Sequence, residues 1–181
     1  MYGIGRQGPC SGPQPGGRPL HGGFLFPAAQ EGGILKGKVI AVCRGARKGC
    51  AKEEVGSGLF EKGRGLAGDA HAGTQKEVSI LPKEKVDTLA DETGLSFPPG
   101  AFAENLLIEG PEAEKILPGV RLRIGEAVLE VQQIGKDPDI PHSYQTQGHS
   151  LLPRYGIFAQ VIHGGIVKRG DEVEWFPPSP R

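Results

Sequence analysis

The sequence predicts a mainly β protein, built as a closed or nearly closed β-barrel with one clear helix. Short runs rich in β-branched residues recur along residues 34–176, and a hairpin pattern lies among them. Helical periodicity is clear only over residues 82–94. Many short strands with a single helix favour a sheet that closes on itself, because closure leaves no open edge.

The chain is expected to hold one domain, residues 34–176, between two tails. Glycine (30) and proline (16) make up a quarter of the 181 residues, and hydrophobic residues only 37%. Residues 1–33 combine many Gly and Pro with few β-branched side chains, so they cannot bury enough apolar surface to offset their chain entropy. We therefore predict a disordered tail over 1–33 and a frayed end over 177–181.

The first half of the domain supplies two strands and the helix. The run 37–44 predicts a strand with Cys43 directed into the core, and 78–81 predicts a short buried strand. Pro82 suits the first turn of the helix, whose apolar residues recur at helical spacing, and Gly94 suits its end.

The second half is predicted to be almost entirely β. Residues 121–124 and 127–131 alternate polar and apolar side chains about Gly125-Glu126, which is a hairpin pattern. Further strands are expected at 101–108, 156–163 and 171–175.

Charge and composition exclude two classes of partner. Lys plus Arg (21) equal Asp plus Glu (21), whereas a general nucleic-acid binder carries a basic excess. No apolar run approaches the roughly 20 residues that span a bilayer. The three cysteines, Cys10, Cys43 and Cys50, form no CxxC pair, and the N-terminus lacks a signal-peptide pattern. We expect a cytoplasmic protein without nucleic-acid or membrane partners.

Two segments carry polar residues typical of a pocket wall. Residues 65–73 place Asp69 and His71 in a glycine-rich loop, where a ligand can approach the main chain closely. Glu104 and Asn105 lie within the apolar segment predicted as a strand, so one of them should point inward. A buried polar group without a partner costs about 1–3 kcal/mol, which points to a partner or a ligand.

Two basic residues lie farther along the chain. Lys136 opens the long polar connection 135–153, and Arg154 lies between a proline and a glycine turn. Together with amides of the glycine loop, these cations would suit a phosphate or pyrophosphate.

Seven motifs in order resemble one family. They are Gly-Asp-Ala-His-Ala-Gly (68–73), Val-Ser-Ile-Leu (78–81), Gly-x-Phe-x-Glu-Asn-Leu (100–106), Leu-Arg-Ile-Gly-Glu-Ala-Val-Leu-Glu-Val (122–131), Gln-Ile-Gly-Lys (133–136), Arg-x-Gly-Ile-Phe-Ala (154–159) and Gly-Gly-x-Val-x-x-Gly-Asp (164–171). This series is similar to the MOSC domain, the module named after the C-terminal part of molybdenum-cofactor sulfurases. The resemblance covers residues 36–175.

The resemblance implies a barrel-like fold with short peripheral helices and a pocket for the molybdenum cofactor, a pterin dithiolene that carries a phosphate. It implies reduction of N-hydroxylated compounds or carriage of sulfur for metal–sulfur centres, with a small-molecule substrate and a redox or cofactor-delivery protein as partners. By this match the cofactor-binding residues are Asp69, His71, Glu104, Asn105, Lys136 and Arg154.

The chain departs from the family at one position. The family usually has a cysteine two residues after the Gly-Lys of this loop, where this chain has Asp137 and then Pro138. Proline can neither bind molybdenum nor carry a persulfide, and thiolate is the soft ligand such chemistry needs. The candidate substitutes are Asp137, His142 or His149 in the same loop, and Cys50, whose basic neighbours favour the thiolate.

Three functions remain open at this level. The chain is a MOSC-type molybdenum enzyme or sulfur carrier, a non-catalytic module that holds or delivers the cofactor, or a barrel that binds another phosphorylated small molecule. The identity of the metal ligands does not follow from the sequence.

Overall fold

A computed structural model describes residues 35–110, 116–136 and 144–176, all within one compact unit, Gly32–Arg181. The predicted tails, 1–33 and 177–181, lie outside the described residues. So do Asp137 and His142, two of the candidate catalytic residues, together with Pro138.

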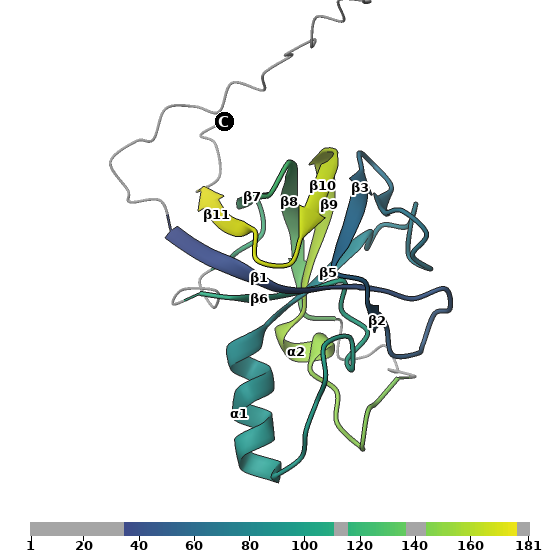
Figure 1. Ribbon diagram of the computed structural model, residues 1–181, viewed down its shortest axis with the longest axis vertical. Coiled ribbons are helices and arrows are strands. Elements are labelled where there is room, and N and C mark those ends of the chain that lie inside the picture. Colours follow the sequence, from purple (N-terminus) through teal and green to yellow (C-terminus); the bar gives the residue numbers. More distant parts are fainter. Residues whose placement is uncertain (1–34, 111–115, 137–143, 177–181) are drawn as a thin grey trace, which may run out of the picture. The chain divides into compact units, whose positions relative to one another are not determined.

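Eleven strands and two helices make up the described fold (Figure 1). In chain order they are β1 (Leu35–Arg44), β2 (Glu53–Glu54), β3 (Ser57–Glu61), β4 (Gly65–Leu66), β5 (Val78–Pro82), α1 (Lys83–Thr93), β6 (Leu106–Glu109), β7 (Arg121–Ile124), β8 (Ala127–Ile134), α2 (Leu152–Tyr155), β9 (Ile157–His163), β10 (Gly165–Lys168) and β11 (Glu172–Phe176).

The predicted β-barrel is confirmed. Strands follow the order β11-β7-β8-β9-β5-β6-β1-β2, and a further pairing of β11 with β1 closes seven of them into a barrel. Closure joins the two ends of the domain, since Leu35 pairs with Trp175. Strands β10, β3 and β4 form a separate small sheet.

Helix α1 is the crossover connection between two parallel strands, β5 and β6. Parallel neighbours need such a connection. Pro82 precedes the helix, and Gly94 ends it in the left-handed conformation while its N–H donates to the Ala90 carbonyl at 2.8 Å. The prediction of a helix at 82–94 is thus correct to within one residue at each end.

The barrel separates two apolar clusters. On β9, Ile157 and Ala159 point into the barrel interior, whereas Phe158 points outward. The outer cluster also contains Val86 of α1 and Leu152 of α2, so both helices cover the outside of the barrel on this side. Cys43 belongs to the outer cluster and is fully buried, as predicted.

The structure corrects one predicted strand. The strand expected at 101–108 begins only at Leu106, because the chain turns before it. Ala103 has a φ of 67°, in the left-handed region that an extended strand cannot include. The hairpin is confirmed and longer than predicted, since β8 continues to Ile134.

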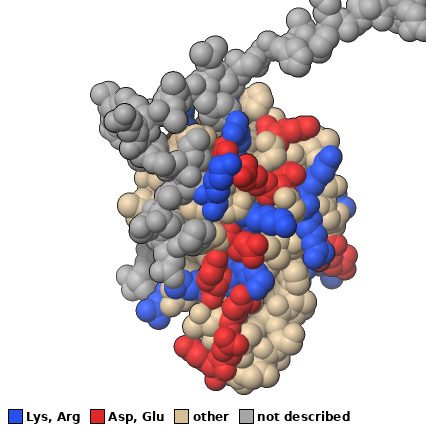
Figure 2. Space-filling model, turned by 60° about the vertical axis from the view of Figure 1, so that its left-hand side comes forward, with Lys and Arg blue, Asp and Glu red and all other residues tan. Residues whose placement is uncertain are grey.

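The face of the molecule drawn in Figure 2 carries basic and acidic side chains side by side, in keeping with the formal net charge of zero. Among the described residues, exposed ion pairs include Lys36 with Glu172 at 2.7 Å. Within the described residues, no helix is both long and apolar enough to cross a bilayer.

Candidate functional site

Asp69 is the anchor of the glycine-rich loop. Its carboxylate accepts hydrogen bonds from the backbone N–H groups of Gly45 and His71, each at 3.0 Å. Burial alone would raise the pKa of Asp69, but the His71 side chain, the Lys52 charge and these two N–H groups together hold that pKa well below its ordinary value. Asp69 is therefore a carboxylate at neutral pH.

Lys52 lies behind Asp69 and neutralises it. The Lys52 Nζ atom lies 3.1 Å from Oδ1 and 3.0 Å from Oδ2 of Asp69, in a pair closed to solvent. Burial lowers the pKa of Lys52, and the negative charges of Asp69 and Glu104 oppose that shift. Lys52 thus lies in the electrostatic field of both buried carboxylates.

His71 lies next to the buried Lys52–Asp69 pair and is partly open to solvent. Its Nδ1 atom lies 3.5 Å from Asp69 Oδ1, and 34% of its side chain is exposed. A carboxylate beside Nδ1 favours the tautomer that carries the proton there, which leaves Nε2 free to accept a proton or bind a ligand.

Glu104 is buried within its own loop. Its carboxylate accepts hydrogen bonds from the N–H groups of Gly100 (2.6 Å) and Phe102 (3.1 Å). Burial raises the pKa of Glu104, although these N–H groups and Lys52 oppose the shift. The expectation that only one of Glu104 and Asn105 points inward is wrong, because the turn at Ala103 abolishes strand alternation and buries both.

Asn105 joins three segments of the fold. Its Oδ1 atom accepts hydrogen bonds from the Ser79 N–H and hydroxyl, each at 3.1 Å, and its Nδ2 atom donates to the Cys43 carbonyl at 3.3 Å. These contacts hold the turn at residues 100–105 against β5 and β1. The polar groups of Asn105 are thus partnered within the protein.

Gly100 lies at the start of the turn that carries Glu104 and Asn105. Because it has no side chain, this turn can contact the backbone of Lys52. Gly100 has a φ of +83°, and a Cβ atom there would lie 2.1 Å from the Lys52 carbonyl oxygen. The Lys52 N–H donates to the Gly100 carbonyl at 2.9 Å. Any side chain at this position would separate the segments that hold Asp69 and Glu104.

Lys136 lies beside a second lysine, Lys76, over the same aromatic ring. The Nζ atoms of Lys136 and Lys76 lie 5.9 Å and 5.0 Å from the centroid of the same ring, Phe158. Burial, and then the charge of Lys76, lower the pKa of Lys136. Among the described residues neither ammonium group has a carboxylate partner. We call these two residues and Phe158 the lysine pair site.

The lysine pair site is continuous with the Asn105 network. Phe158 lies opposite Ser79 in the β5–β9 pairing, and Ser79 is the partner of Asn105. Five predicted residues therefore share one region of the fold: Asp69, His71, Glu104, Asn105 and Lys136.

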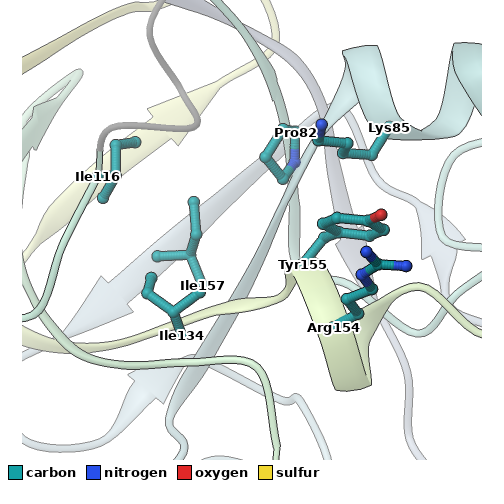
Figure 3. A pocket seen from close by; sticks show the side chains of 7 residues that line it. All are labelled: Pro82, Lys85, Ile116, Ile134, Arg154, Tyr155 and Ile157. Atoms are coloured by element: carbon teal, nitrogen blue, oxygen red, sulfur yellow. The ribbon is translucent and has the colours of Figure 1, made fainter.

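Arg154 lies elsewhere. It lines a pocket of about 230 Å³ with Lys85, Tyr155, Pro82 and three isoleucines (Figure 3). Its guanidinium carbon lies 5.1 Å from the centroid of the Tyr155 ring. Lys136 is not among the residues that line this pocket.

The described cysteines differ in chemistry. Burial raises the pKa of the Cys43 thiol to about 12, with the charges of Glu104 and Glu54 adding to the shift. Cys50 is exposed and lies within electrostatic range of Tyr144, whose pKa is raised mainly by burial and further by Glu104 and Cys50. Cys50 is thus the solvent-accessible thiol among the described residues.

Tyr144 also contacts the segment that leads to Glu104. Its hydroxyl donates to the Ala101 carbonyl at 2.7 Å. His149, by contrast, packs edge-on against Phe97, with ring centroids 6.1 Å apart. Among the described residues, no three His, Cys, Asp or Glu side chains come together in a group that could hold a metal ion.

Sequence reasoning missed Lys52, Lys76 and Tyr144. Lys52 lies in a basic loop that looks solvated, and only its distant partner Asp69 shows that it is buried. Lys76 had one available signal, its position between the glycine loop and the 78–81 strand.

The barrel, its glycine-rich loop and its Glu-Asn turn agree with the family that the sequence motifs resemble. The chain belongs to the MOSC domain family, whose model matches residues 67–174, more than half of the chain. No curated protein matches the chain.

Solved structures share the fold. The YuaD protein from Bacillus subtilis superposes with a TM-score of 0.64 at 20% identity, covering 79% of this chain and 97% of its own. YiiM from Geobacillus stearothermophilus gives 0.59 at 18% identity, covering 78% and 75%. YiiM from Escherichia coli gives 0.55 at 21% identity, covering 80% and 72%.

Proposed function

We propose that this chain binds the molybdenum-pterin cofactor of its family by the cofactor phosphate, and acts as a module that holds or delivers it. The lysine pair site carries the proposal. The two ammonium groups lie over one ring and have no carboxylate partner among the described residues. They repel each other, and a bound anion would attract both.

The electrostatics of the site favour an anion of more than one charge. Burial and Lys76 both lower the pKa of Lys136, so the protein alone destabilises its charged form. A bound phosphate would reverse this effect, because a nearby negative charge favours the ammonium form. The buried residues Asp69, Glu104 and Asn105 would act by fixing the loops around the site, and His71 would present its Nε2 atom to the ligand.

The metal end of the cofactor finds less support. Cys43 is fully buried with a pKa near 12, so it is a thiol rather than a soft thiolate at neutral pH. Cys50 is exposed beside Tyr144 and is the candidate to take the place of the family's cysteine. When bound, the cofactor would supply the molybdenum centre used for N-hydroxyl reduction or sulfur carriage, with a redox or cofactor-delivery protein as partner.

The test is cofactor content after expression in a host that makes the cofactor. Purified full-length protein should contain molybdenum, measured by mass spectrometry, and a pterin, measured by fluorescence after oxidation. The variant Lys76→Gln/Lys136→Gln should lose most of both. The matched control, Lys62→Gln/Lys168→Gln, removes two exposed lysines and should retain both.

Two outcomes would oppose the proposal. A wild-type protein without molybdenum and pterin would exclude cofactor binding, and equal loading of the two double variants would exclude the lysine pair. Retention of a phosphorylated compound without pterin would favour the alternative function, a binder of another phosphorylated small molecule. If loaded protein reduces N-hydroxylated compounds, Cys50→Ser tests whether the exposed thiol is required.

A further inference from the structure

We infer a second binding site, separate from the lysine pair site, for a small organic carboxylate with an apolar body. The site is the pocket lined by Arg154, the Arg154 pocket. It lies between α1, α2 and the ends of β5, β8 and β9.

The Arg154 pocket has two chemically different sides. Figure 3 shows Ile116, Ile134 and Ile157 on one side, and Tyr155 with the two basic residues on the other. Pro82 lies between them at one end. Lys85 Nζ and Arg154 Cζ each lie 5.1 Å from the centroid of the Tyr155 ring, so the aromatic ring holds both cations at the pocket.

The lining separates this pocket from the lysine pair site, since Lys76, Lys136 and Phe158 are not among the residues that line it. Ile157 and Phe158 are adjacent on β9, so their side chains point to opposite faces of the barrel wall. Ile157 belongs to the inner cluster and lines the Arg154 pocket. Phe158 belongs to the outer cluster and lies beneath Lys136.

The lining selects the class of ligand. An arginine presents paired N–H donors that match a carboxylate, and it has no ion-pair partner among the described residues. Four apolar residues line the pocket, and a monoanion with an apolar body would bury that body against them, which inorganic phosphate cannot do.

The volume limits the size of the ligand. A pocket of about 230 Å³ lies below the roughly 300–1,000 Å³ typical of sites for drug-sized ligands. A single aromatic ring or a short branched chain with one carboxylate is therefore the expected class. A pterin cofactor is larger than this pocket can hold.

Benzoate provides the test, by titration into isotopically labelled full-length protein and detection of amide resonances. We expect benzoate to shift the amides of Ile134, Tyr155 and Ile157, and to bind more tightly than benzyl alcohol, acetate or inorganic phosphate. Arg154→Gln should weaken benzoate binding about tenfold or more. Arg64→Gln, which removes an arginine with a 65% exposed side chain, should leave it unchanged.

A second variant tests the apolar side. Ile134 is 38% exposed, so Ile134→Glu should fold and should abolish benzoate binding by placing a negative charge at the pocket. Three results would overturn the inference: no benzoate binding to wild-type protein, equal affinity in the Arg154→Gln variant, or equal affinity for benzyl alcohol. The Lys76→Gln/Lys136→Gln variant should bind benzoate like wild type, which separates this test from that of the proposed function.

Discussion

Lys52 and Asp69 form an ion pair from which solvent is excluded. The Nζ atom lies 3.1 Å and 3.0 Å from the two carboxylate oxygens, and the two side chains are 1% and 0% exposed. Such a pair gains little net stability from its formation, but removal of one partner leaves an uncompensated charge in the interior. The pair therefore constrains mutation more strongly than any exposed charge of this protein.

Replacement of Lys52 by methionine should destabilise the protein by about 3–5 kcal/mol, because Asp69 would remain buried without its counter-charge. Denaturant unfolding of the full-length protein measures this difference. Arg169→Met, which breaks a largely exposed pair with Glu54, should leave the free energy of unfolding close to that of wild type. Equal stability of the two variants would mean that Asp69 finds another partner.

Replacement of Gly100 by alanine should cost at least about 2 kcal/mol of stability. The left-handed φ of +83° strains an L-residue, and the new methyl group would meet the Lys52 carbonyl oxygen. Gly63→Ala is the matched control, since Gly63 has a φ of +66° with nothing within 4 Å of the added atom. Thermal unfolding should separate the two, and similar losses in both would show that φ strain alone accounts for the effect.

Cys43 should make the protein less stable in alkali. Its folded-state pKa is about 12, whereas an unfolded cysteine titrates near 8.5–9. The unfolded state then binds fewer protons between pH 9 and 12, so stability is fully present below about pH 9 and falls by up to about 1.4 kcal/mol per pH unit above it. Cys43→Ala should unfold with a smaller pH slope over this window, and an unchanged slope would contradict the assignment.

Lys76 should control the protonation of Lys136. Removal of its charge in Lys76→Met should raise the pKa of Lys136, because a like charge no longer disfavours the ammonium form. Carbon-13 NMR of reductively methylated protein follows this titration directly. Lys62→Met should not change the Lys136 pKa, and the same pKa in all three proteins would show that the two ammonium groups do not interact.

The regular elements of this fold could be predicted because their signals are local. The helix carries its own start and stop residues, Pro82 and Gly94, and the hairpin carries its turn at Gly125. The strands β2, β3, β4 and β10 were not predicted. Strand β2 is two glutamates and the other three each contain a glycine, so none carries a clear apolar pattern. Strands β3 and β10 also pair with each other across a large sequence separation.

The site was less predictable for the same reason. Asp69, Glu104 and Asn105 are polar residues in apolar or glycine-rich surroundings, so the sequence singled them out. Their partners lie in other segments of the chain: Lys52 pairs with Asp69, and Ser79 hydrogen-bonds to Asn105. These contacts exist only in the tertiary structure, so the sequence does not reveal them. Arg154 and Lys136 are close in the backbone, yet Arg154 lies over the Tyr155 ring and Lys136 over the Phe158 ring, which no spacing rule reveals.

The pairing of β1 with β11 has a consequence for biosynthesis. The first strand of the domain pairs with its last strand, Leu35 with Trp175. This edge of β1 can therefore form its hydrogen bonds only after β11 has left the ribosome. Contacts of such large sequence separation slow folding and leave an unpaired edge exposed in the meantime. A nascent chain that ends before Glu172 should therefore need chaperones and aggregate in their absence, whereas the completed chain closes its own edge.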